Sequence, residues 1–203
     1  MQRLPLAKGV IAFLIAYPLL TIIGLSYGEA YGRACFPLYR LTLDVVAPDF
    51  TVARLKVNRP RHEKLIVARF VSQAEIPSEG RSLPAGAEIK ASTLLGHAVQ
   101  HLILMYTVIV AWLTMQSASL RRWIVTFGVS VPVLAAVEAL DVPFVLAGSV
   151  ADLVLFELAP GQLATSPLVN WMNFLNGGGR LALALVGGAV AVWIATMVAK
   201  SRG

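Results

Sequence analysis

The stretch GVIAFLIAYPLLTIIGLSYG, residues 9–28, contains no charged side chain. About 20 helical residues at a rise of about 1.5 Å each span roughly 30 Å, the thickness of the hydrocarbon core of a bilayer. A secretory signal would look similar, because Arg3 and Lys8 precede the apolar run and Gly28-Glu29-Ala30 would permit cleavage. The run is longer than a usual signal core, so we expect a retained transmembrane helix within residues 1–29.

The composition of the whole chain favours the same environment. Of its 203 residues 57% are hydrophobic and 14% are charged, and the mean hydropathy is +0.72. A water-soluble protein of this length would need more polar surface. The formal charge of +6 is not gathered into a basic patch interleaved with aromatic residues, so we expect no nucleic-acid partner. A single cysteine excludes an internal disulfide.

Three further apolar segments are long enough to cross a membrane. They comprise residues 91–120, residues 123–140 with Pro132 inside, and residues 181–199. With the first segment they predict a mainly α-helical membrane protein with four transmembrane helices. The last three helices would form a membrane domain of residues 91–203.

The positions of the basic residues predict how the chain is oriented. Six Lys and Arg residues fall on one side of a four-helix arrangement: Arg3, Lys8, Arg121, Arg122, Lys200 and Arg202. None of the 11 acidic residues falls on that side, and an excess of Lys and Arg marks the cytoplasmic side. We therefore expect an integral protein of the bacterial inner membrane with both termini in the cytoplasm and residues 30–90 and 141–180 outside.

The first outer region, residues 30–90, is predicted to be a small extracytoplasmic β-rich domain between the first two helices. Thr51–Val57 and Lys64–Val71 are rich in β-branched residues with partial alternation, and residues 58–63 between them have the composition of a turn. These features predict a β-hairpin. Residues 88–90 are expected to form a short strand that leads directly into the second transmembrane helix.

The second outer region is predicted to lie at the membrane surface. Val142–Phe156 is apolar, but it contains Asp152 and is too short to span the bilayer comfortably. We expect an interfacial or re-entrant segment covering about residues 142–178. Trp171–Leu175 suits the level of the lipid headgroups, and Asn176–Gly179 would interrupt the chain before the last helix.

Four ionisable residues form the candidate site. His97 and His101 are four residues apart, and Glu138 and Asp141 are three apart, so each pair shares one face of a helix. Both pairs would lie within about 10 Å of the same outer membrane boundary. Two imidazoles and two carboxylates could bind zinc, iron or copper. The alternatives are hydrogen bonding between packed helices, which we favour, and proton transfer.

Cys35 is a second point of chemical interest. It lies between Arg33 and Arg40, which would lower its pKa if they are close. Together with Arg180 and one of the two histidines it could form a thiol site. We expect instead that Cys35 packs as a small apolar residue, and that Arg180 pairs with an aspartate of the outer region or with lipid phosphate.

The segment WMNFLNGGGR, residues 171–180, leads into an Ala/Leu-rich last helix. It is similar to the end of small membrane proteins associated with exosortase systems, which also share the layout of one helix, an outer β-rich insert and a terminal group of helices. This resemblance implies an accessory role in processing or exporting envelope proteins. The chain departs from exosortases proper, which look like larger bundles of about eight helices, so the roles of their cysteine, arginine and histidine are not assigned to Cys35, Arg180 and His97.

The remaining sequence features favour a non-catalytic function. The sequence shows neither a phosphate-binding loop nor a nucleophile elbow. Gly187, Ala191 and Ala195 recur every four residues, and a small-residue face allows another helix to approach closely. We expect a membrane subunit or accessory factor of a cell-envelope complex, which contacts other membrane proteins through this face and the outer domain, and lipid elsewhere. A metal-binding protein or metalloenzyme is the second hypothesis. A transporter is a weaker third, because no internal repeat is evident.

Overall fold

The computed structural model describes residues 3–60, 63–78 and 81–200. Within these residues four helical segments are long and apolar enough to cross a membrane, as predicted: Pro5–Ala34, Leu95–Met115, Leu120–Leu158 and Pro167–Ala199. The helices themselves are α1 (Arg3–Ala34), α2 (Phe36–Val46), α3 (Leu95–Met115), α4 (Leu120–Leu158), α5 (Pro167–Phe174) and α6 (Arg180–Lys200). Arg202, which contributed to the predicted orientation, lies outside the described residues.

The chain divides into two compact units. The helical unit contains the residues up to Gly28, Val99–Val137 and the residues from Arg180 onward. The sheet unit contains Glu29–Ala98 and Glu138–Gly179.

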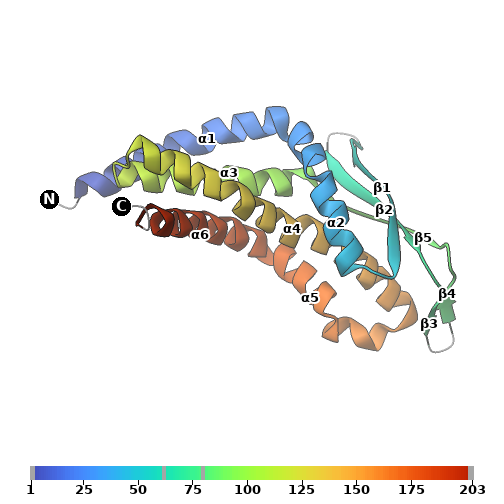
Figure 1. Cartoon of the computed structure of the whole chain (residues 1–203). Helices are drawn as coiled ribbons and strands as arrows, with labels where there is room; N and C mark the ends of the chain where they lie inside the picture. Colours follow the sequence, from blue (N-terminus) through green and yellow to red (C-terminus); the bar gives the residue numbers. More distant parts are fainter. Residues whose placement is uncertain (1–2, 61–62, 79–80, 201–203) are drawn as a thin grey trace. The chain divides into compact units, whose positions relative to one another are not determined.

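In the helical unit, α1, α3, the first half of α4, and α6 run side by side (Figure 1). The small-residue face of α6 is used within this unit, since Ala191 and Ala195 are buried. A Cβ added at Gly187 would lie 2.9 Å from the Cγ2 atom of Val137 on α4. The helices that approach this face therefore include one of the chain's own, which explains why the small residues recur.

The sheet unit contains a three-stranded antiparallel sheet in the order β1 (Phe50–Asn58), β2 (Leu65–Ser72) and β5 (Glu88–Leu94). The predicted hairpin is confirmed, with Asn58 paired to Leu65; Arg61 and His62 of its turn lie outside the described residues. The second membrane helix begins later than predicted, because residues 91–94 pair with β2 as the end of β5. A small second sheet pairs β3 (Ile76–Ser78) with β4 (Arg81–Leu83).

Helix α2 was not predicted. It lies beside β1 (Figure 1) and buries Tyr39 and Leu43 completely. The sheet contributes Ile66, Ala68 and Phe70 of β2 to the core, all of them inaccessible to solvent. The region from residue 30 to 90 therefore contains a helix packed with a sheet, and the prediction of a β-rich domain missed the helix.

Helix α4 is longer than a membrane requires. Its 39 residues have a length of about 58 Å at the usual helical rise, roughly twice the hydrocarbon thickness. Residues 142–156, which we predicted to be a separate interfacial or re-entrant segment, are the continuation of this helix.

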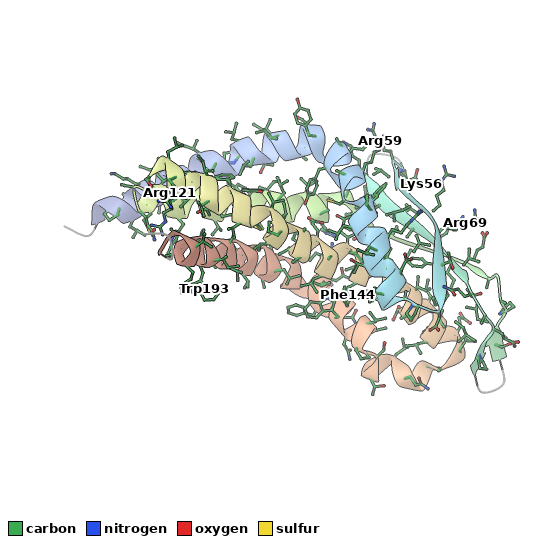
Figure 2. The ribbon with its side chains drawn as sticks, viewed as in Figure 1. Lys56, Arg59, Arg69, Arg121, Phe144 and Trp193 are labelled. Carbon is green, nitrogen blue, oxygen red and sulfur yellow. The ribbon has the colours of Figure 1, made fainter. Side chains whose placement is uncertain are left out.

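Helix α5 folds back onto the second half of α4 after a 3₁₀ turn, Pro160–Thr165. The indole Nε1 of Trp171 donates a hydrogen bond of 2.9 Å to the carbonyl of Leu140, and its ring meets Phe144 edge-on (Phe144 is labelled in Figure 2). Met172 and Leu175 are buried, so this segment packs within the protein. The predicted break before the last helix is confirmed, because Gly178 has a φ of +112°, a conformation that only glycine adopts without strain.

Candidate functional site

A buried carboxylate with two tyrosine partners is the best-defined polar feature of the sheet unit. Glu138 on α4 is only 1% exposed. The hydroxyl of Tyr31 donates to its Oε1 atom at 2.8 Å, and the hydroxyl of Tyr39 donates to its Oε2 atom at 2.5 Å. The Tyr39 contact is shorter than the usual O–H···O length of about 2.7–2.8 Å. Each carboxylate oxygen is therefore held by one phenol.

The two tyrosines and Cys35 lie at successive helical positions, four residues apart. The backbone N–H of Cys35 donates to the carbonyl of Tyr31 at 3.1 Å, and the N–H of Tyr39 donates to the carbonyl of Cys35 at 2.9 Å. The helical bonding pattern thus continues from α1 into α2, and the three side chains share one face. We call Tyr31, Cys35, Tyr39 and Glu138 the tyrosine–glutamate cluster. The four-residue spacing was the sequence signal for it, but we had interpreted this region as β-rich.

Burial and the nearby charge of Glu138 raise the pKa values of Tyr39 and Cys35 and so keep both groups protonated. Burial, and next the nearby charge of Glu138, raise the pKa of Tyr39 well above its ordinary value, so its hydroxyl stays a donor. The pKa of the Cys35 thiol is raised to about 11, mainly by burial and next by the charge of Glu138. Hydrogen bonds with the hydroxyls of Tyr39 and Tyr31 lower this pKa, but by less than the other two causes raise it. We had expected Arg33 and Arg40 to lower this pKa if they lay close to the thiol; neither is among the causes of the shift, and the pKa is raised. A neutral thiol is a poor nucleophile, so the cluster is suited to structure.

The raised pKa predicts how Cys35, the only cysteine, reacts with an alkylating reagent. Because the thiolate is the reactive form, the alkylation rate should keep rising about tenfold per pH unit from pH 8 to 10. At pH 8 the thiolate fraction should be roughly 100-fold below that of a cysteine with an ordinary pKa of 9.0. Mass spectrometry of protein quenched at timed intervals measures the rate.

The shape of this profile separates acidity from accessibility, since limited access lowers the rate at every pH equally. Removing the nearby charge with Glu138→Gln should move the midpoint to lower pH, because that charge is one cause of the shift. A plateau reached below pH 9.5 in the wild-type protein would contradict the assignment.

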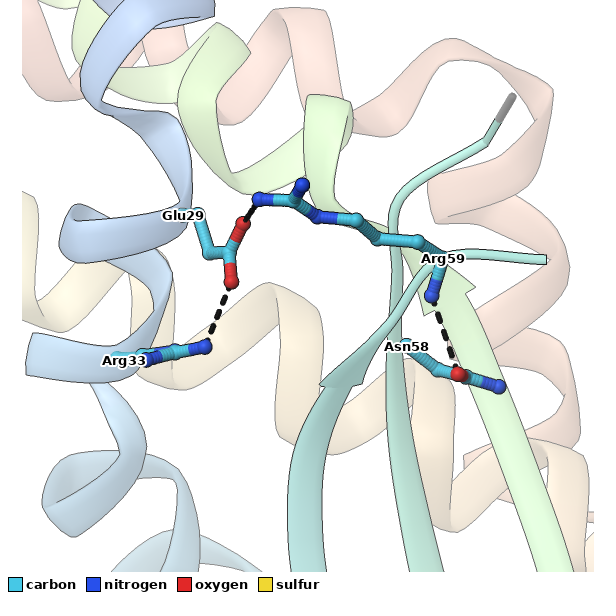
Figure 3. A network of polar contacts seen from close by, with 4 residues as sticks. All are labelled: Glu29, Arg33, Asn58 and Arg59. Atoms are coloured by element: carbon cyan, nitrogen blue, oxygen red, sulfur yellow. Dashed lines mark hydrogen bonds and ion pairs between the residues drawn. The ribbon is translucent and has the colours of Figure 1, made fainter. Parts of the chain in front are cut away.

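A second polar network joins the β1–β2 hairpin to the end of α1. The carboxylate of Glu29 accepts a hydrogen bond from Arg33 at 2.7 Å and another from Arg59 (Figure 3). The backbone N–H of Arg59 also donates to the side-chain oxygen of Asn58 at 3.1 Å (Figure 3). The hairpin end is thereby tied to the helix that precedes α2.

An open groove lies between α2 and β1. Its volume is about 640 Å³, and its lining mixes apolar and charged side chains: Arg33, Phe36, Pro37, Arg40, Leu41, Asp44 and Leu55. Leu41 is 67% exposed although it lies outside the four membrane-length segments. We call this feature the α2 groove.

The four residues predicted to bind a metal lie in two different units. His97 on α3, together with Glu138 and Asp141 on α4, belongs to the sheet unit, whereas His101 belongs to the helical unit. His101, Glu138 and Asp141 are buried, and His97 is half-buried. Among the described residues, no three His, Cys, Asp or Glu side chains gather closely enough to hold a metal ion. The four-residue metal site therefore stays a prediction from the sequence.

Arg180 opens α6 in the helical unit and is 5% exposed. Residues 171–180, on which we based the predicted resemblance, cover the second half of α5, the break at Gly178 and this arginine. No protein-family model, curated protein or solved structure matches the chain.

Proposed function

We propose that the chain is a non-catalytic subunit or accessory factor of a membrane complex in the cell envelope. In this proposal it is anchored in the bacterial inner membrane with both termini in the cytoplasm, and the sheet unit faces outward. Support comes from four membrane-length helices and from the Lys and Arg bias at the termini and between α3 and α4. The resemblance of residues 171–180 to exosortase-associated proteins agrees with an accessory role.

The α2 groove carries the proposal. Exposed apolar side chains outside a membrane span mark surfaces that bind other molecules, and apolar centres rimmed by arginine are common in protein interfaces. The tyrosine–glutamate cluster offers no activated nucleophile, since the thiol stays protonated and both carboxylate oxygens are engaged. Because the small-residue face of α6 packs within the chain, we assign partner contact to the sheet unit.

The test is the assembly state of the full chain expressed with a small tag at native level in its source cells. After extraction in mild detergent, native electrophoresis and native mass spectrometry should find it in an assembly heavier than a monomer. Leu41→Glu in the groove should release the chain from that assembly. Val45→Glu is the matched control, because Val45 is 73% exposed on the same helix but does not line the groove. A wild-type protein that runs as a partnerless monomer would refute the proposal.

Metal binding is the second candidate. It is favoured by the Nδ1 atom of His97, which is buried and makes no hydrogen bond. Elemental analysis of purified protein should then find stoichiometric zinc, iron or copper, which the His97→Ala/His101→Ala double variant should lose. Sub-stoichiometric metal that these substitutions leave unchanged would end this candidate.

A further inference from the structure

A β-bulge in β1 changes which residues face outward. Val52 pairs with Phe70, but the next paired residue is Arg54, opposite Arg69, so Ala53 is an extra residue in β1. Strict alternation would place Arg54 on the same face as buried Val52. The extra residue turns Arg54 to the outer face instead, as bulges commonly do with side chains near functional surfaces.

The bulge completes a row of three cations across the sheet. Arg69 on β2 lies directly opposite Arg54 on β1 and opposite Lys90 on β5. Lys56 lies two residues beyond Arg54 on the same face, and Figure 2 shows Lys56 and Arg69 extending from one side of the sheet. We call Arg54, Lys56, Arg69 and Lys90 the basic face.

This face carries an unbalanced charge. Its one acidic residue is Glu88, which pairs with Arg69, so four basic residues less one acidic residue leave +3. Arg54, Lys56 and Lys90 are exposed, and the ion pairs found among the described residues do not include them. Like charges directly opposite each other destabilise a sheet. An anionic ligand would relieve this repulsion.

We propose that the basic face binds an acidic segment of a partner protein. This inference rests on the proposed function, because it names the chemistry of the partner that an accessory subunit would contact. The occupant follows from charge complementarity, which fixes orientation and accelerates association at protein interfaces.

The position of the row along β5 favours a protein segment over lipid headgroups. Lys90 lies four residues before Leu94, where β5 ends and the membrane-length helix α3 begins. The row is thus separated along the strand from the start of that helix, so we assign it to an acidic segment of a partner protein. Binding to anionic vesicles is the alternative outcome of the test.

The test measures binding of a defined acidic probe to the full chain in phosphatidylcholine nanodiscs. The probe is a fluorescein-labelled ten-residue peptide in which Glu and Thr alternate, and fluorescence anisotropy reports its binding. We expect salt-dependent binding that Arg54→Glu and Lys90→Glu each weaken at least tenfold. Arg121→Glu on α4 is the matched control, since it makes the same change of charge at an exposed site in the helical unit, outside both the basic face and the α2 groove, and it should change affinity less than twofold.

Each other outcome overturns the proposal. These outcomes are the absence of peptide binding, equal losses of affinity in Arg54→Glu and Arg121→Glu, or a protein that binds vesicles containing phosphatidylglycerol through the basic face but does not bind the peptide. The assembly experiment separates a failure of the basic-face proposal from a failure of the proposed function. If Arg54→Glu/Lys90→Glu stays in the large assembly and still binds the peptide normally, the basic face is excluded while the proposed function stands. A monomeric wild-type protein removes the proposed function itself.

Discussion

Glu138→Ala should be among the most destabilising single substitutions in the sheet unit. It removes the acceptor of two hydrogen bonds from the tyrosine hydroxyls and leaves a cavity where a buried side chain stood. An unsatisfied buried donor costs about 1–3 kcal/mol, so we expect a loss of about 2–6 kcal/mol for the two hydroxyls. The apparent midpoint of thermal unfolding in mild detergent, followed by tryptophan fluorescence at a fixed scan rate, measures the effect.

A graded series tests whether the hydrogen bonds are the cause. Glu138→Gln keeps the shape and one acceptor oxygen, so it should lower the midpoint less than alanine does. Tyr39→Phe should be destabilising in the wild type, because it removes the 2.5 Å bond to the carboxylate. In the Glu138→Ala background the same change should be nearly neutral, since the hydroxyl has already lost its acceptor. A Glu138→Ala midpoint within 1 °C of wild type would refute a structural role for the cluster.

The membrane-length helices were predictable because bilayer thickness sets a minimum length for an apolar run. The same criterion could not predict the end of α4. A minimum length shows only that a helix can span the bilayer, and it gives no information on whether the helix continues, as α4 does to Leu158. The hairpin was predictable from β-branched residues on both sides of a turn. The bulge at Ala53 was not, because only the pairing with β2 reveals the extra residue.

The sequence indicated one part of the candidate site, Glu138, but not its tyrosine partners. Glu138 stood out because an ionisable residue inside an apolar helix demands a partner. Its partners were missed, because Tyr31 and Tyr39 lie about 100 residues away and contacts at that separation leave no local periodicity. A helical interpretation of the four-residue spacing from Tyr31 through Cys35 to Leu43 would have predicted α2 and its buried face. We had instead assigned all of residues 30–90 to a β-rich domain, because β-branched residues are frequent from residue 51 onward.

Two glycines of α4 should respond differently to the same substitution. A Cβ added at Gly148 would lie 2.7 Å from the Cβ of Met172 and 2.9 Å from the carbonyl oxygen of Leu168, both on α5. Neither atom can move away by a side-chain rotation, so Gly148→Ala must push α5 away from α4. Such overpacking costs about 1–3 kcal/mol. At Gly128 the added Cβ would meet nothing within 4 Å, and alanine is favoured over glycine inside a helix by up to about 1 kcal/mol.

Thermal unfolding of the two variants, under the conditions used for Glu138→Ala, compares these effects directly. Gly148→Ala should lower the midpoint, and Gly128→Ala should leave it unchanged or raise it. Gly148→Ala should also disturb the hydrogen bond from Trp171 to Leu140, which would appear as a shift in tryptophan emission that Gly128→Ala does not produce. Equal effects at both positions would mean that α5 does not pack against α4 at Gly148. A lower midpoint for Gly148→Ala alone would show that α5 packs closely against the second half of α4 at Gly148.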